Sequence, residues 1–163
     1  MIMDKMMEIK PIGIIRTPFT ELEGMPIQPK GATGVKGTVE LFHDFQAGLK
    51  DIDGFSHIIL IYMFHRCQGF NLQVVPFMDT TSRGVFATRA PKRPNPIGLS
   101  VVQLDRIENG ILHVLNVDIL NGTPLLDIKP FVPGFDCPQD VRTGWLENST
   151  DNVSAKKSDG RFK

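Results

Sequence analysis

Four basic side chains lie close together in the segment RGVFATRAPKR, which spans residues 83–93 and contains no acidic residue. In a chain whose 18 Lys and Arg residues balance 18 Asp and Glu residues, this is a local excess of positive charge. Such side chains can bind a phosphate, a carboxylate or an RNA backbone. A charge run is more often a solvated loop, but these cations stand among apolar residues and prolines. The segment is therefore a candidate binding site through its basic residues Arg83, Arg89, Lys92 and Arg93.

The segment RPNPIGLS, residues 93–100, continues the basic run with an unusually stiff backbone. Proline has a fixed φ, and it confines the residue before it to extended geometry. Arg93 and Asn95 each precede a proline, so four consecutive residues keep little backbone freedom. A stiff backbone presents its side chains with little loss of conformational entropy when a ligand binds. The stiffness therefore predicts a preorganised site.

A histidine and an arginine follow the most apolar stretch of the chain. His65 and Arg66 come directly after HIILIYMF, residues 57–64, at the end of an expected strand, where functional sites are often built. The alternative is a polar pair that only marks the strand leaving the core. Two carboxylates, Asp118 and Asp127, stand at the ends of later apolar runs and need charged partners if they are buried.

The chain lacks the local motifs of several common enzyme classes. It has no GxSxG nucleophile elbow, no HExxH zinc motif, no Walker loop and no GxGxxG between a strand and a helix. Its two cysteines form no CxxC pattern and its four histidines show no zinc-ligand spacing, so no disulfide framework and no metal site are expected. No signal peptide is evident, and no apolar run approaches the ~20 residues of a membrane helix. We therefore expect a soluble cytoplasmic protein that contacts no membrane.

Short β-strands have to position these residues, because the chain shows almost no helical periodicity. Asn109-Gly110 lies between two runs rich in Val, Ile and Leu, which is the strongest short hairpin signal. One or two helical turns are expected over residues 44–50, capped by Asp44. The continuous apolar run 57–64 is typical of a strand buried on both faces. Strands are expected over residues 8–17, 35–42, 57–64, 82–88, 99–107, 111–117 and 125–132.

About seven short strands separated by turn signals predict an all-β (mainly β) protein. We expect a small closed or partly open β-barrel of mostly antiparallel short strands, with one or two short helices. Residues 18–34, rich in Pro and Gly, form a long loop of the kind that is often functional. The barrel domain is expected over residues 8–145, and the polar residues 146–163 are expected to form a disordered C-terminal tail.

Two long segments resemble a known family. GVFATRAPKRPNPIGLS, residues 84–100, and NGTPLLDIKP, residues 121–130, resemble the TsaA-like family, whose characterised members are TrmO-type tRNA methyltransferases. Shorter matches follow the same order, namely PIGIIRTPF, PIQP, FSHIILIYMFH and FVPGFD, so the resemblance covers about residues 8–145. It implies a small β-barrel that binds S-adenosylmethionine, outside the Rossmann-type methyltransferases, and that forms homodimers. The characterised members methylate N6 of the threonylcarbamoyl-modified adenosine next to the anticodon of certain tRNAs.

The resemblance also implies a cofactor pocket. Arg89 would hold the methionine carboxylate in a charge-assisted pair, Asp118 would bind the adenosine hydroxyls or N6, and Leu99 would pack on the adenine or the sulfonium methyl. Asn121 stands where many family members carry aspartate. The implied cofactor-binding residues are Pro26, Ile27, Gln28, His65, Arg66, Arg89, Leu99, Ser100, Asp118, Ile119, Leu120 and Asn121.

Methyl transfer from a sulfonium depends mainly on alignment with the accepting nitrogen. An exocyclic amine is a poor nucleophile because its lone pair is delocalised into the ring, so a base that removes its proton helps. Asp127 and His65 are the two candidate catalytic bases, and the sequence does not choose between them. The residues expected to face the RNA or the threonylcarbamoyl carboxylate are Arg83, Lys92, Arg93 and Lys129.

Two other functions fit the same residues. The barrel would methylate a different substrate, such as a small molecule, since the balanced charge of the whole chain shows no strong RNA footprint. Alternatively, it would be a non-catalytic module that binds S-adenosylmethionine as a sensor.

Overall fold

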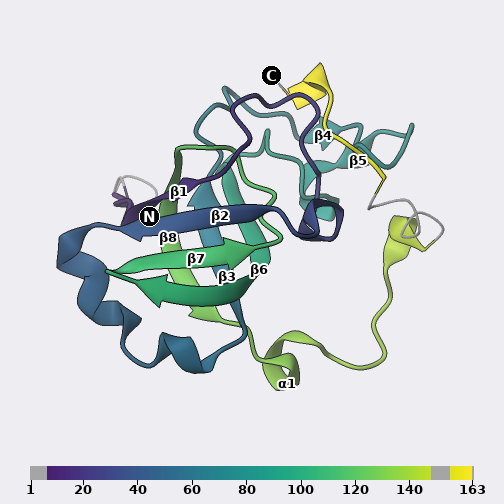
Figure 1. The fold of residues 1–163 in the computed structure, drawn as a ribbon. Helices are drawn as coiled ribbons and strands as arrows, with labels where there is room; N and C mark the ends of the chain where they lie inside the picture. The colour runs from purple at the N-terminus through teal and green to yellow at the C-terminus, as the bar shows by residue number, and fades with distance from the viewer. Residues whose placement is uncertain (1–6, 148–154, 163) are drawn as a thin grey trace.

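Six antiparallel strands close into a barrel in the computed structural model, which describes residues 7–147 and 155–162 (Figure 1). Around the barrel the strands follow the order β1-β2-β7-β6-β3-β8. The barrel strands are β1 (Gly13–Arg16), β2 (Lys36–Leu41), β3 (His57–Met63), β6 (Ile97–Glu108), β7 (Ile111–Leu115) and β8 (Thr123–Pro130). The prediction of an all-β barrel is therefore confirmed, and the barrel is closed.

The remaining elements are short and connect or flank the barrel strands. A small hairpin pairs β4 (Gln73–Val74) with β5 (Arg83–Gly84), and α1 spans Pro133–Asp136. The 3₁₀ turns are η1 (Pro29–Ala32), η2 (His43–Leu49), η3 (Ile52–Gly54), η4 (Val85–Ala87), η5 (Gly144–Leu146) and η7 (Gly160–Phe162).

The barrel interior is the main hydrophobic core. Side chains alternate along each strand, so one face of every strand lines the interior and the other faces outward. In β3, Ile58, Leu60 and Tyr62 are buried, and the side chains between them are only partly buried. The expectation that residues 57–64 are buried on both faces is therefore wrong, because a closed barrel leaves its outer surface uncovered here.

The β6–β7 hairpin forms at Asn109-Gly110, as predicted. The backbone φ is 52° at Asn109 and 77° at Gly110. A two-residue hairpin turn of this kind needs positive φ at both positions, which Asn and Gly adopt with little strain.

Two local predictions hold only in part. The expected strand over residues 82–88 is a strand only at its start, because the chain turns into η4 after Gly84. The turn is closed by Thr88, whose backbone N–H and Oγ1 both donate to the Val85 carbonyl, at 3.1 and 2.8 Å. Residues 44–49 do form helical turns as part of η2, but the N-cap is Phe42 and not Asp44, and no side-chain capping hydrogen bond forms.

The end of the chain packs against the loops at one end of the barrel, beside β4 and β5 (Figure 1). Residues 148–154 and 163 of the expected disordered tail lie outside the described residues. Within residues 155–162, Lys157 forms an isolated bridge with Pro26 and Phe162 is only 8% exposed. The buried ring of Phe162 provides an apolar contact in a segment that is otherwise polar. A domain boundary at residue 145 stays a prediction.

Candidate functional site

One end of the barrel carries a cavity of about 930 Å³. β3 ends there, whereas β6 and β8 begin there, because both are antiparallel to β3. This geometry brings the residues after β3 next to the first residues of β6 and β8. The long loop at residues 22–30, residues 86–93 and the C-terminal end of the chain complete the wall. A mainly apolar cavity of this size, with a few polar groups, suits a cofactor-sized molecule.

A chain of hydrogen bonds, formed by Tyr62, Ser100 and Asp118, supports one side of the cavity. Ser100 Oγ donates to Asp118 Oδ1 at 2.7 Å, so its remaining contact, 3.0 Å to the Tyr62 hydroxyl, has Tyr62 as the donor. Burial, together with the negative charge of Asp118, raises the pKa of Tyr62 well above its usual range and keeps it a donor. Burial also raises the pKa of Asp118 to about 6, against the opposing effects of the Ser100 hydrogen bond and of Arg89. Asp118 and Tyr62 both line the cavity.

We predict that Asp118→Asn stabilises the protein above pH 6. The folded state holds the Asp118 proton more tightly than the unfolded state does, so this carboxyl lowers stability as the pH rises from about 4 through about 6. This shift of the Asp118 pKa corresponds to at most about 3 kcal/mol. Because Asp118 is partly exposed, we expect the free energy of unfolding to rise by about 1–2 kcal/mol at pH 7.5. The measurement is the difference in Tm between variant and wild type from pH 4 to 8. A difference in Tm that does not grow with pH would contradict the raised pKa of Asp118. The control is Asp53→Asn, at an exposed position.

The stiff segment after residue 90 holds the neighbouring basic loop in place. Nη1 of Arg93 donates to the carbonyls of Thr88 and Ala90, at 3.1 and 3.2 Å. These two hydrogen bonds hold the backbone on both sides of Arg89. The Phe64 N–H donates to the Pro96 carbonyl at 2.8 Å, which ties the same segment to the end of β3. These contacts agree with the preorganisation expected from the prolines.

Glycine at position 98 lets an aromatic ring lie against the β6 backbone. A Cβ built on Gly98 would overlap the Tyr62 ring and crowd Phe64. Both rings and Gly98 line the cavity. Any other residue here would displace Tyr62, and with it the hydrogen bond to Ser100.

His65 lines the cavity in a defined orientation. Oγ1 of Thr123 donates to the Leu120 carbonyl at 2.7 Å, so it can only accept a hydrogen bond from His65 Nδ1, 3.4 Å away. With the ring proton on Nδ1 this contact is a hydrogen bond, and in that tautomer Nε2 is the proton acceptor. Burial and the charge of Arg66 lower the pKa of His65, although a hydrogen bond with the Met63 backbone opposes them. The imidazole is therefore neutral at physiological pH.

Most of the predicted cofactor residues share the cavity, and three do not line it. Ser100 acts through its hydrogen bond to Asp118, and Ile119 is buried in the barrel core. Oδ1 of Asn121 accepts from the Thr17 N–H at 3.2 Å, a contact that an aspartate oxygen can make equally well. The predicted residues that line the cavity are Pro26, Ile27, Gln28, His65, Arg66, Arg89, Leu99, Asp118 and Leu120.

Asp127, one of the two predicted bases, does not line the cavity. It pairs with Lys129, with the two charged groups 2.8 Å apart, in the later part of β8. Lys129 lies six residues along β8 from Thr123, or about 20 Å at the rise of an extended strand. The structure therefore leaves both Asp127 and Lys129 out of the cavity lining. Asp127 still lies in the same cross-strand row as Leu99, because both residues pair with Ile61 of β3.

The other predicted RNA-binding cations have different surroundings. Arg83 pairs with Asp79 at 2.7 Å and lies over the Trp145 ring, 5.6 Å from its centroid. Arg93 lines the cavity, whereas Lys92 is not among the lining residues.

Several lining residues were missed by the sequence interpretation. Tyr62 and Thr123 look like ordinary strand residues until the barrel register places them at the cavity. Trp145 donates its Nε1–H to the Ala87 carbonyl at 2.8 Å, and Ser158 and Phe162 come from the expected tail. In the sequence, only Phe162, the one aromatic residue of that polar tail, indicated that the tail could pack against the rest of the protein.

Within the described residues, no helix is long and apolar enough to cross a membrane. In the same part of the chain, no group of three or more His, Cys, Asp and Glu side chains is arranged to hold a metal ion.

Comparisons with known proteins show the family to which the chain is similar. Residues 14–137 match the family described as the tRNA-methyltransferase O N-terminal domain. A probable S-adenosyl-L-methionine-binding protein of Pyrococcus abyssi is 54% identical over 162 residues, which cover 99% of this chain and 88% of that protein. A tRNA (adenine(37)-N6)-methyltransferase of Rattus norvegicus is 32% identical over 139 residues, covering 81% of this chain and 32% of that enzyme. The crystal structure of TrmO from Pseudomonas aeruginosa superposes with a TM-score of 0.73 at 40% identity, and the match covers 86% of this chain and 63% of that one.

Proposed function

The chain belongs to the tRNA-methyltransferase O N-terminal domain family, and on that premise we propose that it is an S-adenosylmethionine-dependent methyltransferase that modifies N6 of the threonylcarbamoyl-adenosine next to the anticodon of tRNA. The observation that carries the proposal is the single cavity that Arg89, Asp118 and His65 all line. The chain spans 63% of the TrmO structure and 32% of the rat enzyme, so activity and substrate are both part of the proposal.

The cavity offers groups that fit the cofactor. S-adenosylmethionine combines an amino-acid carboxylate, two ribose hydroxyls, an adenine ring and a positively charged sulfur. Arg89 and Arg66 can bind the carboxylate in charge-assisted hydrogen bonds. Asp118 can accept from the ribose hydroxyls or from the adenine amine, and Leu99 and Leu120 supply apolar walls for the ring.

The protein contributes orientation and proton transfer. The bound cofactor supplies an activated methyl group, so the chain has to align the N6 nitrogen of the substrate with it. His65, neutral and with Nε2 free to accept, is the proposed proton acceptor for N6. The carbonyl of Leu120 fixes the Thr123 hydroxyl, which in turn fixes the orientation of the imidazole ring.

The decisive experiment is transfer of labelled methyl from S-adenosylmethionine to two tRNA pools, one with and one without the threonylcarbamoyl modification. We expect label in the modified pool only. Label in neither pool, with cofactor binding confirmed by calorimetry, would favour a small-molecule substrate. A search with candidate small molecules that also gives no turnover would favour the sensor module.

We predict that Lys92→Ala weakens tRNA binding and leaves cofactor affinity unchanged. Lys92 lies between the cavity-lining residues Pro91 and Arg93 but does not line the cavity itself. Each phosphate contact that is lost reduces the slope of log affinity against log salt concentration by about one. The expected loss of tRNA affinity is about three- to tenfold at low salt, measured by filter binding over a salt series. Arg93→Ala is a poor substitute, since Arg93 grips the backbone around Arg89. Lys50→Ala, at an exposed position beside η2, is the control, and equal losses for both lysines would contradict the prediction.

We also propose that the protein works as a cytoplasmic homodimer, as the family resemblance implies. Light scattering at several protein concentrations tests the dimer, and a monomer at all of them would contradict it.

A further inference from the structure

The C-terminal residues 155–162, here called the clasp, are tied to the loop that precedes the predicted cofactor residues Pro26 to Gln28. The Gly24 N–H donates to the Ser158 carbonyl at 2.9 Å, and the Ser158 N–H donates to the Met25 carbonyl at 2.7 Å. The Ser158 side chain accepts from the Met25 N–H at 2.9 Å and donates to the Leu22 carbonyl. These contacts amount to one short antiparallel pairing between segments more than 130 residues apart in the sequence.

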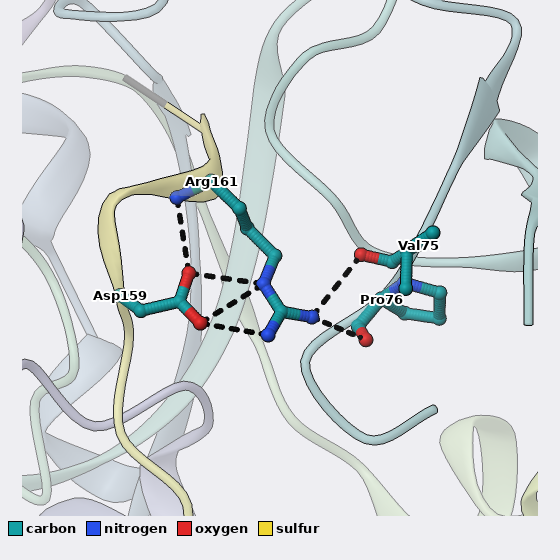
Figure 2. Close-up of polar contacts among 4 residues, drawn as sticks. All are labelled: Val75, Pro76, Asp159 and Arg161. Atoms are coloured by element: carbon teal, nitrogen blue, oxygen red, sulfur yellow. Dashed lines mark hydrogen bonds and ion pairs between the residues drawn. The ribbon is translucent and has the colours of Figure 1, made fainter. Parts of the chain in front are cut away.

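A second set of contacts joins the clasp to residues 75–77, and Figure 2 shows those with Val75 and Pro76. Nη1 of Arg161 donates to the Pro76 carbonyl at 2.9 Å and, more weakly, to the Val75 carbonyl at 3.4 Å. Its Nε and Nη2 donate to the Asp159 carboxylate at 2.9 and 2.7 Å, which fixes the guanidinium plane (Figure 2). The guanidinium also lies over the Phe77 ring, 5.1 Å from its centroid.

A third contact is apolar and reaches the basic loop. Phe162 packs with Val74, Val85 and Ala90 in a small core separate from the barrel interior. Its ring meets the edge of Phe77 at a centroid distance of 5.0 Å. Ala90 is the residue directly after Arg89, so the ring supports the backbone that carries this arginine.

We propose that the clasp is a working part of the cofactor site, with Arg161 and Phe162 as positioning residues that hold three loops of the cavity wall together. The proposal rests on the proposed function, in that the cavity is taken to bind S-adenosylmethionine. The clasp also forms part of the cavity wall, because three of its residues line the cavity, namely Ser158, Asp159 and Phe162. Coupling between two sites is reciprocal, so a bound ligand must stabilise the docked clasp by the same free energy by which the clasp improves ligand binding.

The test compares the affinity of S-adenosylmethionine for Phe162→Ala and Arg161→Ala with the affinity for the full wild-type chain, by calorimetry. Each variant is expected to raise Kd about tenfold, within the ~5- to 150-fold range typical of coupled sites. Phe162→Leu, which keeps an apolar anchor, should recover most of the affinity. The matched controls are Phe135→Ala, where the ring is 83% exposed, and Arg142→Ala, also at an exposed position.

Hydrogen exchange gives a second readout that general destabilisation does not mimic. The cofactor should slow exchange in wild type at residues 22–28 and 155–162, and Arg161→Ala should lose this protection while β7 stays protected. Affinity unchanged in both variants, or exchange in the clasp unaffected by the cofactor, would overturn the proposal. A wild-type chain that binds no S-adenosylmethionine would overturn the proposed function instead.

Discussion

Replacing Arg89 by alanine is expected to raise the Kd for S-adenosylmethionine by about 30- to 100-fold. Arg89 lines the cavity on a loop whose backbone is held on both sides by Arg93, so its guanidinium is presented at low entropic cost. A charge-assisted hydrogen bond from a guanidinium to a carboxylate is worth about 1.5–3 kcal/mol, and a bidentate pair lies at the upper end. Since about 1.4 kcal/mol is a factor of ten in affinity, the loss should be large and easy to measure.

Calorimetry with S-adenosylmethionine and with its demethylated product S-adenosylhomocysteine measures this effect. Both ligands carry the same carboxylate, so both should lose the same factor if Arg89 binds that group. Arg89→Lys keeps the charge without the planar fork and should lose about tenfold. Arg142→Ala is the control at an exposed position. Unchanged affinity in Arg89→Ala would mean that the cofactor pocket is placed wrongly.

Replacing His65 by glutamine is expected to slow methyl transfer by about 10²- to 10³-fold, the usual contribution of a general base. Glutamine keeps a polar group of similar length but cannot take a proton at neutral pH. The expected signature is a fall in kcat with KM for S-adenosylmethionine changed only a few fold, because Arg89 and Asp118 remain in place. His113→Gln, on β7 and not among the cavity-lining residues, is the matched control.

The pH profile adds an independent check on His65. Burial lowers its pKa, so the imidazole should remain an active base below pH 6.5 and lose activity only as the pH falls through this lowered value. His65→Gln should remove that limb of the kcat profile. A profile that keeps its acidic limb in His65→Gln would transfer the role to another group, with Asp118, which also lines the cavity and whose pKa is raised to about 6, as the next candidate.

The barrel could be predicted from sequence because its signals are local. Alternating apolar residues and the Asn109-Gly110 turn specify strands and a hairpin without reference to the rest of the chain. The segment 82–88 also has strand composition, but its conformation is set by side-chain and backbone bonds of Thr88 to Val85 and by its place on the cavity wall. Composition carries no information about such contacts.

The site was predicted less completely, for a similar reason. Charge and position in the sequence singled out Arg89, Asp118 and His65, the family resemblance gave them roles in a cofactor pocket, and the structure brings all three to one cavity. Tyr62 and Thr123 depend on how β3, β6 and β8 are aligned, because the register decides which side chains meet at the barrel end. Asp127 is close to the site in sequence but does not line the cavity, since it lies four residues along β8 from Thr123.

The closure of the barrel by β1 has a consequence for the newly made chain. β1 is only four residues long, and one of its two neighbours, β8, does not begin until residue 123 of 163. During synthesis, therefore, β1 keeps one edge unpaired until β8 has been translated. Pairing between strands so distant in sequence is intrinsically slow. A chain stalled before β8 would expose that edge to other nascent chains, and an unpaired strand edge promotes aggregation.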